Sequence, residues 1–346
     1  MMKKTISQCM IVKNEEKNIR RALSWGKDIM CEQIVVDTGS SDRTVEIARE
    51  MGAKIFFFPW INDFAAAKNF AIDQAKGDWI AFLDADESFT PEDTKKIPEI
   101  LEYVGDDVDG LLTGIVDLDE NNHITSGGTM IRFFVNRPDL RYVGKIHEHL
   151  VRKGRSGLHL TDATEQLAFL HTGYQEQEKK DKSKFERNRN IILEILKQEP
   201  ENCDYLGYLG DTYSSDGKNE EARDAYKKAV AAMPEKLGVY DQRSSYTYTN
   251  LLRVSQCLNA PEAEVEAIYK EAVEKLPKEP DFDCVMGDWY WRKGQYEKAV
   301  QMYELAIAKL ETYGTVNRGI YTTSMLIQMY ECLGEGCRKL GDYQKA

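Results

Sequence analysis

The stretch "WIAFLDADESF", residues 79–89, places three carboxylates directly after a run of apolar residues. The apolar run predicts a buried strand, and Asp84, Asp86 and Glu87 stand at its end. Because strand side chains alternate between two faces, Asp84 and Asp86 are expected on the same side. Two converging carboxylates repel each other unless a cation lies between them, and such oxygen ligands suit Mg²⁺ or Mn²⁺. The stretch therefore predicts a divalent-metal site at a strand end.

The residues before this stretch alternate between strand-like and helix-like patterns. Helical patterns at 14–25, 40–52 and 63–77, the first with Asn14 as a possible cap, separate four apolar runs, at 5–12, 32–38, 53–60 and 78–86. This βαβαβαβ order predicts right-handed crossovers and a mostly parallel sheet. Ligands of such sheets bind at the carboxyl ends of the strands. Asp37, at the end of the second run, is expected at that edge together with Asp84 and Asp86.

The following segment, residues 87–173, is less regular. Residues 109–119, 123–136 and 141–152 have the pattern of strands, which predicts an α+β extension of the same sheet. All five histidines of the chain lie between residues 123 and 171. In "GKIHEHL", strand alternation would place His147 and His149 on one face and Glu148 on the other.

From about residue 180 the sequence changes to glycine-punctuated helices with an internal repeat. The 34-residue tetratricopeptide pattern fits two units closely, through Leu209, Gly210, Tyr213, Ala222, Tyr226, Ala229 and Pro234, and through Gly287, Tyr290, Ala299, Tyr303 and Ala306. A degenerate copy between them has Tyr269, Ala272 and Pro277 and carries an insertion of about nine residues. Because one unit cannot bury its apolar face alone, the units are expected to stack.

A fourth unit, with Leu333 and Gly334, would end at Ala346 before its second helix is formed. Its first helix is therefore expected to leave four side chains only partly covered, Met325, Leu326, Met329 and Leu333. Two explanations follow, a longer native chain and a dimer formed through the repeats.

The bulk composition excludes several classes of protein. The net charge of −12 over 346 residues argues against simple electrostatic binding of nucleic acid. The N-terminal apolar run is too short for a signal peptide or a membrane span, so a cytoplasmic protein is expected. Seven scattered cysteines without a CxxC pair indicate reduced thiols, neither a disulfide framework nor a zinc site.

The motifs in residues 5–175 together resemble family 2 glycosyltransferases. The resemblance rests on "CMIVKNEEKNIRRAL", "QIVVDTGSSDRTVEIAREMGAKI", "WINDFAAAKNFAIDQAKGDWIAFLDADE" and "GKIHEHL". Two branches are most similar, the lipopolysaccharide-core glucosyltransferases and the bacteriocin cysteine glycosyltransferases of the sublancin type, which carry tetratricopeptide repeats. The resemblance implies an α/β GT-A nucleotide-sugar-binding domain followed by an all-α repeat array. The expected boundaries are 1–175 for the GT-A domain, 176–199 for a connecting helix and 200–346 for the repeats.

The same resemblance assigns roles to individual residues. The base and ribose of the nucleotide would contact Ile11, Val12, Asn14 and Glu15, and Asp37 would read the uracil edge, with Asp42 in the turn that follows. The sugar and diphosphate would be flanked by Asp63, Lys68 and Asn69. The family often has arginine where Lys68 stands, and lysine keeps the charge but loses bidentate hydrogen bonding. Asp84, Ala85 and Asp86 match the DxD motif, in which Asp86 would bind Mn²⁺ or Mg²⁺ directly and Asp84 would contact the ribose or a metal-bound water.

Glu148 is the predicted catalytic residue. An inverting transfer needs a carboxylate opposite the departing diphosphate to take the acceptor's proton; the alternative is that Glu148 is a surface carboxylate. His147 or His171 would complete the metal sphere or bind the diphosphate, while a buried, hydrogen-bonded His171 and a zinc site are the alternatives. Four arginines in the same half, Arg132, Arg137, Arg141 and Arg152, could neutralise the leaving group, and the sequence does not rank them.

The sequence thus predicts an inverting, metal-dependent hexosyltransferase. Glucose or N-acetylglucosamine would move from a UDP-sugar to a peptide or protein acceptor, because tetratricopeptide grooves commonly hold peptides. One alternative is a transferase acting on a cell-envelope glycan or lipid-linked sugar. Another is a catalytically inactive repeat scaffold, against which the intact DxD motif argues. The repeats could also serve only to dimerise the enzyme.

Overall fold

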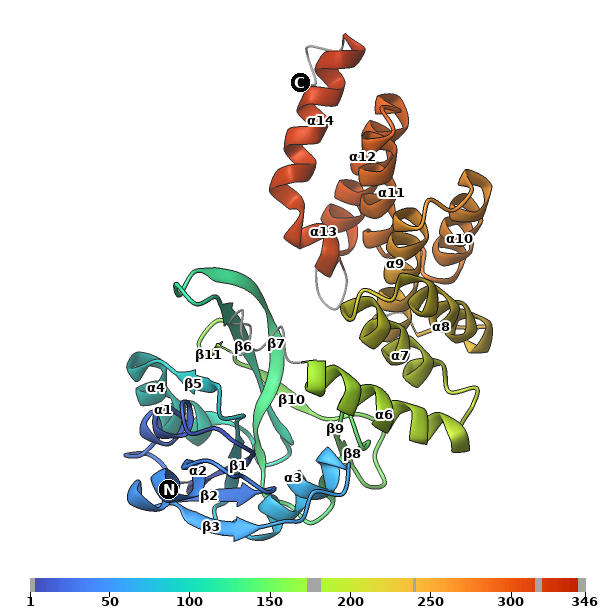
Figure 1. Cartoon of the computed structure of the whole chain (residues 1–346). Helices are drawn as coiled ribbons and strands as arrows, with labels where there is room; N and C mark the ends of the chain where they lie inside the picture. Colours follow the sequence, from blue (N-terminus) through green and yellow to red (C-terminus); the bar gives the residue numbers. More distant parts are fainter. Residues whose placement is uncertain (1–3, 173–181, 239–240, 315–318, 342–346) are drawn as a thin grey trace. The chain divides into compact units, whose positions relative to one another are not determined.

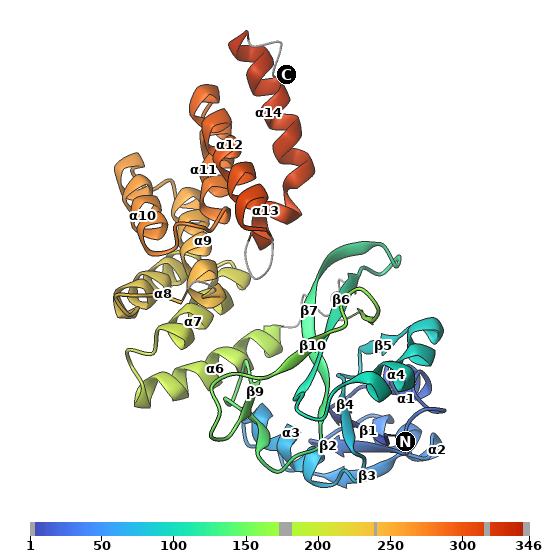
Figure 2. The ribbon, with the colours of Figure 1, turned by 180° about the vertical axis from the view of Figure 1, so that it is seen from behind.

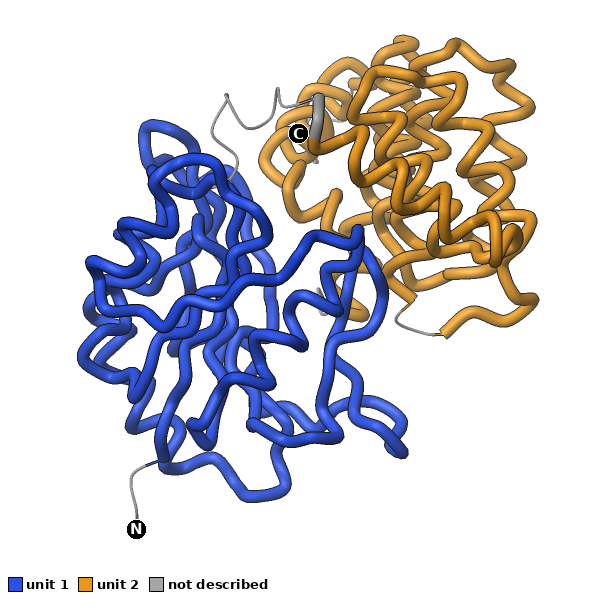
Figure 3. The backbone as a smooth tube through the Cα atoms, turned by 60° about the horizontal axis from the view of Figure 1, so that its bottom comes forward, with its two compact units in different colours: residues 1–181 blue, residues 182–346 orange. Residues whose placement is uncertain are grey.

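The computed structural model describes residues 4–172, 182–238, 241–314 and 319–341. They divide into two compact units, residues 1–181 and residues 182–346 (Figure 3). Each unit has hydrophobic clusters of its own, built from strands and helices in the first unit and from helices alone in the second. Within the described residues, each helix is too short or too polar to cross a membrane.

Unit 1 is built on a mixed sheet (Figure 1). Its strands are β1 (Ile6–Val12), β2 (Glu32–Asp37), β3 (Lys54–Phe57), β4 (Trp79–Phe82), β5 (Glu87–Phe89), β6 (Gly110–Leu118), β7 (Ile124–Val135), β8 (Leu140–Val143), β9 (His149–Arg152), β10 (Leu160–Asp162) and β11 (Ala168–His171). The main sheet has the order β3-β2-β1-β4-β7-β6-β11-β5, with β10 paired to β6, and β8 and β9 form a separate hairpin. The first four strands in this order are parallel, as predicted.

Helices cover both faces of the parallel strands. They are α1 (Ile19–Ser24), α2 (Thr44–Glu50), α3 (Phe64–Asp73) and α4 (Pro91–Tyr103). Met10 and Val12 of β1 pack with α1 and α2, whereas Cys9 of the same strand packs with α3. This alternation follows from the period of two along a strand, and apolar side chains on both faces are what a covered parallel strand requires.

The sheet changes from parallel to antiparallel pairing where β4 meets β7. These two strands are antiparallel and pair over only three residues, Trp79 to Ala81 on β4. Beyond that point β7 pairs with β6 alone, and the two strands continue as a long antiparallel ribbon (Figure 2). The carboxyl ends of β1, β2 and β4 therefore lie beside the start of this ribbon.

Three local expectations from the sequence are wrong. Strand β4 ends at Phe82, so Asp84 and Asp86 lie in a turn and not in the strand. The segment 141–152 is not one strand, because residues 144–148 form a bend between β8 and β9 in which His147 has φ 54°, in the left-handed region. Asn14, with φ 59°, does not cap a helix, because α1 begins only at Ile19.

Unit 2 is entirely helical. Its helices are α6 (Lys182–Gln198), α7 (Cys203–Ser215), α8 (Asn219–Ala232), α9 (Gln242–Cys257), α10 (Glu262–Lys275), α11 (Asp281–Arg292), α12 (Tyr296–Tyr313), α13 (Ile320–Ser324) and α14 (Leu326–Leu340). The predicted register is confirmed, because the Gly210 backbone approaches the Tyr226 ring and, 77 residues later, the Gly287 backbone approaches the Tyr303 ring. Both tyrosines are fully buried and donate to an aspartate of the preceding helix. The observed fold class is thus an α/β unit followed by an all-α unit of repeats, as predicted.

The end of the array differs in part from the expectation. The predicted first helix of the fourth unit is broken at Met325 into α13 and α14. Met329 is buried, contrary to prediction, because α14 packs against α12 and Met329 joins the core of the helical unit. Met325, Leu326 and Leu333 are partly buried, as expected.

The close approach of Gly287 to Tyr303 predicts the effect of Gly287→Ala. An added Cβ would lie 2.6 Å from Tyr303 Cδ1, and Asp288 holds the tyrosine hydroxyl at 2.8 Å, so the ring cannot simply turn away. The gain in helix propensity, up to about 1 kcal/mol, is smaller than an overpacking cost of about 1–3 kcal/mol. We expect a net loss of about 1–2 kcal/mol in the free energy of unfolding, measured by denaturant titration with far-UV circular dichroism. Gly238→Ala, where the added methyl meets nothing within 4 Å, is the matched control, and equal stability of the two variants would contradict the packing argument.

Candidate active site

A buried lysine joins the two groups of carboxylates that the sequence analysis singled out. Lys68, on α3, is only 5% exposed. Its Nζ lies 2.7 Å from Oε1 of Glu148, in the bend between β8 and β9, and 3.9 Å from Oδ1 of Asp84, after β4. The predicted base and the first aspartate of the DxD motif therefore share one cation.

Burial and ion pairing have opposite effects on the pKa values of the charged groups in this cluster. Burial alone would lower the pKa of Lys68, but Asp84 and Glu148 outweigh it and the pKa is raised. Burial would raise the pKa of Asp84, but Lys68 and Arg132 hold it below its usual range. The ammonium and the carboxylate are thus both charged near neutral pH. The structure places Lys68 among protein carboxylates, although the resemblance assigned it to the donor diphosphate.

Arg132, on β7, supplies the second cation of the site because of a local irregularity in its strand. Leu111 of β6 pairs with Phe133 and Leu112 pairs with Ile131, so Arg132 is the extra residue of a β-bulge. A bulge redirects a side chain, and Arg132 is turned into the interior, where its exposed fraction is 6%. Its guanidinium pairs with Glu87 and lies 3.6 Å from Oδ2 of Asp84.

Glu87 fixes the turn that carries the two aspartates. Its Oε2 accepts a hydrogen bond from the backbone N–H of Asp84 at 3.0 Å, while Oε1 accepts from Arg132. Burial raises the pKa of Glu87 to about 7, an effect that Arg132 opposes. Neither the pairing partner of Glu87 nor the special position of Arg132 was predicted, because a bulge has no signature in the sequence of one strand.

His171 and Asp86 form the part of the site that fits a metal ion. Nε2 of His171 lies 3.4 Å from Oδ2 of Asp86, and Nδ1 lies 2.8 Å from Oδ1 of Asp117 on β6. Burial alone would lower the pKa of His171, but Asp86 and Asp117 raise it to about 9. A proton therefore occupies the space between the imidazole and Asp86 unless a cation replaces it.

The donor atoms present fit a divalent ion with two protein ligands. In an octahedral shell with bonds of about 2.1 Å, neighbouring ligand atoms are about 3 Å apart, close to the separation of Asp86 Oδ2 and His171 Nε2. Asp117 would orient the ring from its far side, as outer-shell carboxylates do. Across the described part of the chain, His, Cys, Asp and Glu side chains nowhere gather in a group of three suited to a metal. Water and donor phosphates would complete the shell, as is common for Mg²⁺ sites.

The loops after β1 and β2 are tied together where the nucleotide was expected. The backbone N–H of Asn14 donates to Ser40 Oγ at 2.9 Å, and its side chain accepts from the N–H of Ser41 at 2.8 Å. Asp37 is buried and accepts from the N–H groups of Gly39 and Ser40 in its own turn. These contacts give the edge of the sheet a rigid pair of loops.

Other residues expected here have mainly local contacts. Asp42 accepts from the N–H groups of Thr44 and Glu16, and the N–H of Glu15 donates to Thr44 Oγ1 at 2.7 Å. Burial would raise the pKa of Asp42, but hydrogen bonds from the Thr44 hydroxyl and from the backbone N–H groups of Thr44 and Glu16 lower it. Ile11 and Val12 form the end of β1, where Ile11 is partly buried and Val12 is buried, as is Ala85 in the DxD turn.

Two residues assigned to the sugar and diphosphate form hydrogen bonds within the protein. Asp63 is the N-cap of α3 and accepts from the N–H of Ala66 at 2.8 Å. Asn69 exchanges two hydrogen bonds of 2.9 Å with the backbone of Tyr142, which ties α3 to β8. Both residues fix the position of α3, the helix that carries Lys68.

The four arginines are now ranked. Arg137 and Arg152 pair with buried Asp109, and Arg141 pairs with Asp73. Only Arg132 of the four contacts the DxD aspartates. His147 is exposed in its bend, and His149 begins β9.

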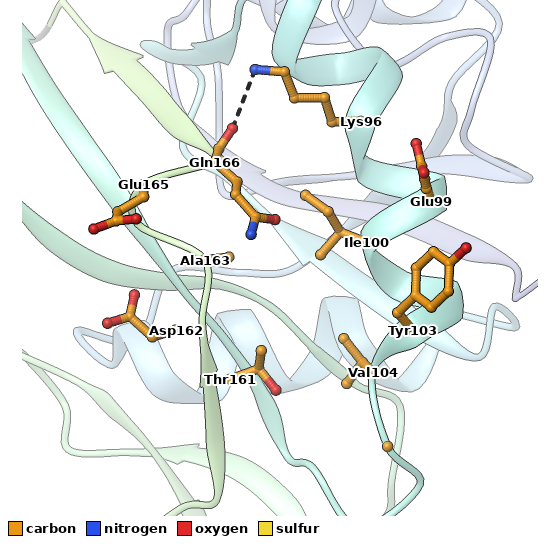
Figure 4. A pocket seen from close by; sticks show the side chains of 11 residues that line it. Lys96, Glu99, Ile100, Tyr103, Val104, Thr161, Asp162, Ala163, Glu165 and Gln166 are labelled. Atoms are coloured by element: carbon orange, nitrogen blue, oxygen red, sulfur yellow. Dashed lines mark hydrogen bonds between the residues drawn. The ribbon is translucent and has the colours of Figure 1, made fainter.

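A separate hollow of about 600 Å³ lies between α4 and residues 161–166 (Figure 4). Tyr103, Ile100 and the backbone of Gln166, which accepts a hydrogen bond from Lys96, form parts of its wall. None of the residues expected to bind a donor or a metal lines it. The hollow is therefore separate from the residues that the sequence singled out.

Comparisons with known proteins concern both units of the chain. Residues 7–151 match the family described as glycosyl transferase family 2, and residues 205–235 and 285–314 match tetratricopeptide repeats. A TPR repeat-containing protein of Synechococcus elongatus is 30% identical over 316 residues, which are 88% of this chain and 75% of that protein. The chain belongs to the family 2 glycosyltransferases. Its catalytic domain is followed by tetratricopeptide repeats.

One further relative and one solved structure are similar over a smaller share of the chain or at lower identity. The SPbeta prophage-derived glycosyltransferase SunS of Bacillus subtilis is 33% identical over 231 residues, 65% of this chain and 53% of SunS. The chain thus spans about half the length of that relative. The solved structure of S. aureus TarS in complex with UDP-GlcNAc is 17% identical with a TM-score of 0.43, over 75% of this chain and 93% of that one.

The Lys68 cluster predicts that Lys68→Met destabilises this glycosyltransferase. Removing the ammonium leaves Glu148 without its cation and Asp84 with Arg132 alone, and breaking a buried pair typically costs several kcal/mol. We expect a loss of about 2–3 kcal/mol in the free energy of unfolding, because Asp84 is partly exposed. Arg20→Met, which removes an exposed pair with Glu50, is the control and should cost less than about 1 kcal/mol. Equal unfolding midpoints for the two variants in urea would contradict the assignment of a buried cluster.

Proposed function

We propose that the chain is an inverting, metal-dependent transferase that moves a hexose from a UDP-sugar to a peptide or protein acceptor. The observation that carries the proposal is the pairing of Glu148 with Lys68 at 2.7 Å, with the same ammonium 3.9 Å from Asp84. A base for the acceptor and a carboxylate of the donor site are thereby held at a fixed separation. Inverting transfer needs this arrangement, since acceptor and leaving group occupy opposite sides of the anomeric carbon.

The donor would lie across the carboxyl ends of β1, β2 and β4. The loops tied together by Asn14 and Ser40 would hold the nucleoside, and Asp37 lies at the base of these loops. The charge on the departing diphosphate would be neutralised in part by a divalent cation held by Asp86 and His171. Arg132 adds a fixed positive charge beside Asp84, and such preorganised charge lowers the barrier when a leaving group becomes anionic.

The transfer itself is a single displacement. The acceptor's hydroxyl or thiol attacks the anomeric carbon, the bond from that carbon to the diphosphate oxygen breaks, and UDP leaves with the bonding electrons. The acceptor's proton passes to Glu148. Because Lys68 contacts Oε1 of Glu148, Oε2 is the oxygen that can receive this proton. A cysteine acceptor would need the base less, since part of a thiol population is ionised near neutral pH.

The polypeptide acceptor is supported by the repeat unit. Stacked tetratricopeptide repeats commonly bind peptide segments, and the Gly210–Tyr226 and Gly287–Tyr303 contacts show that the stack is built in regular register. We attribute to residues 200–346 the recognition of the protein that carries the acceptor, to residues 1–175 the chemistry, and to 176–199 the connection. Glucose and N-acetylglucosamine are the two hexoses proposed.

The test combines a donor screen with one substitution. The purified chain is incubated with Mn²⁺, UDP-glucose or UDP-N-acetylglucosamine, and a pool of heptapeptides with a central serine, threonine or cysteine; UDP release and peptide mass are measured. Glu148→Gln keeps the volume and the contact with Lys68 but cannot take a proton. We expect its rate of transfer to serine or threonine peptides to fall by roughly 10²- to 10⁴-fold, with donor affinity little changed.

Asp86→Asn serves as the companion variant. It retains the shape of the turn but weakens a metal ligand, so it should lose the stimulation by Mn²⁺ as well as transfer. Wild-type rates for Asp86→Asn in the presence of EDTA would overturn the metal assignment. Release of UDP without a mass increase on any peptide would overturn the polypeptide acceptor and favour a glycan or lipid-linked acceptor.

A further inference from the structure

The ribbon formed by β6 and β7 has an open edge beside the active site. β7 runs from Ile124 to Val135 and pairs with β6 along most of its length. Its other side pairs with β4 only at residues 133–135. Among the strands in the described ranges, none pairs with that side of residues 124–131.

The direction of the backbone groups on this edge follows from the neighbouring strands. The N–H of Gly114 donates to Leu167, and the C=O of Leu112 accepts from Ala163, so both β6 residues direct their groups away from β7. Their cross-strand partners are Thr129 and Ile131. When one residue of an antiparallel pair directs its N–H and C=O away from the partner strand, the residue opposite does the same. Thr129 and Ile131 therefore direct their N–H and C=O groups away from β6.

Met130 lies between these two residues, and its backbone groups point toward β6. Its C=O accepts a hydrogen bond from Thr113 Oγ1 on β6 at 2.9 Å. The alternation continues to Gly127, which pairs with Val116. The open edge thus presents the backbone groups of every second residue, Gly127, Thr129 and Ile131.

This edge lacks the usual protection against pairing with another chain. Natural edge strands are commonly blunted by charged side chains or proline. Residues 124–131, "ITSGGTMI", contain neither. Residues 124–130 are all exposed, with Ile124 at 73% and Met130 at 40%. Two adjacent glycines, Gly127 and Gly128, leave room for an approaching backbone.

The edge is connected to the active site at two places. At its base, the bulge residue Arg132 contacts Asp84, so the edge begins where the DxD turn lies. Further along, Ser126 donates to Asp117, which also contacts His171, and His171 contacts Asp86. A chain paired along residues 127–131 would therefore begin beside Asp84, whereas β6 and β11 lie between the edge and Asp86.

We propose that an extended segment of the acceptor polypeptide pairs with the open edge of β7 as an additional strand. The added strand would lie beside β7 in the position that β4 occupies before it ends at Phe82. It would bring one residue of the acceptor toward Asp84 and Glu148. Backbone hydrogen bonds would supply affinity with little dependence on sequence, as in other cases of strand addition. The inference rests on the proposed polypeptide acceptor and assigns its binding mode at the catalytic domain.

The main test compares two sets of backbone-methylated acceptor peptides. The best heptapeptide from the serine, threonine and cysteine pool is resynthesised with N-methyl groups either at positions 1, 3, 5 and 7 or at positions 2, 4 and 6. Because an added strand directs alternate N–H groups toward the edge, only one set loses its hydrogen bonds to β7. We expect kcat/KM to fall by about tenfold or more for one set relative to the other. Equal losses in both sets, or no loss in either, overturn the edge-binding proposal while leaving the peptide acceptor intact.

The protein side is tested by Thr129→Pro with Thr129→Val as its matched control. Proline removes the outward N–H without removing a hydrogen bond to β6, and edge strands tolerate it. We expect Thr129→Pro to lower kcat/KM for the peptide by roughly five- to tenfold, with UDP release in the absence of peptide unchanged, and Thr129→Val to act like wild type. If Thr129→Pro instead dissociates a dimer in light scattering and leaves peptide transfer unchanged, the edge joins two copies and the proposal fails. Absence of sugar on every peptide overturns the polypeptide acceptor itself.

Discussion

The catalytic domain depends on one buried ammonium group. Taking Lys68 out of water is costly unless its charge is matched, and the match comes from Asp84 and Glu148, which belong to distant parts of the chain. α3 carries the lysine, the turn after β4 carries the aspartate, and the bend between β8 and β9 carries the glutamate. The charge therefore fixes three segments relative to one another, and with them the separation of the proposed base from the proposed donor site.

The second determinant of the site is the point at which β7 parts from β4. Three paired residues hold these strands together, and the bulge at Arg132 then turns β7 toward β6 alone. The same bulge directs Arg132 toward Glu87 and Asp84. One irregularity thus supplies the cation that steadies the DxD turn and leaves an open edge beside it. Edge strands of this kind are usually protected, so the lack of protection agrees with a role in binding.

Much of the fold could be predicted because the signals are local. Period-two and period-3.6 patterns identify the first four strands and the repeat helices, and the Gly287–Tyr303 contact follows from the spacing of the repeat. The acidic residues Asp84 and Asp86 were likewise visible at the end of an apolar run, although they were expected in the strand and not in a turn after it. The early end of β4 and the left-handed backbone at His147 were not predicted, because tertiary contacts override alternation there.

The partners within the site could not be predicted from one sequence. Four arginines were equivalent candidates until the bulge singled out Arg132, and a bulge is a property of two paired strands. Lys68 was assigned to a phosphate because its neighbours resemble a donor-binding segment. Its contacts with Glu148 and Asp84 involve residues 80 and 16 positions away, beyond any local pattern.

The most direct test is a double-mutant cycle on the rate of transfer at saturating donor, with Lys68→Met, Glu148→Gln and the double variant. If Lys68 acts by holding the base, its loss should matter much less once Glu148 can no longer take a proton. We predict that Lys68→Met slows the Glu148→Gln enzyme by at least about tenfold less than it slows the wild type, a coupling of about 1.4 kcal/mol or more. Independent effects, in which the two rate losses multiply, would contradict the claim that one buried charge aligns base and donor.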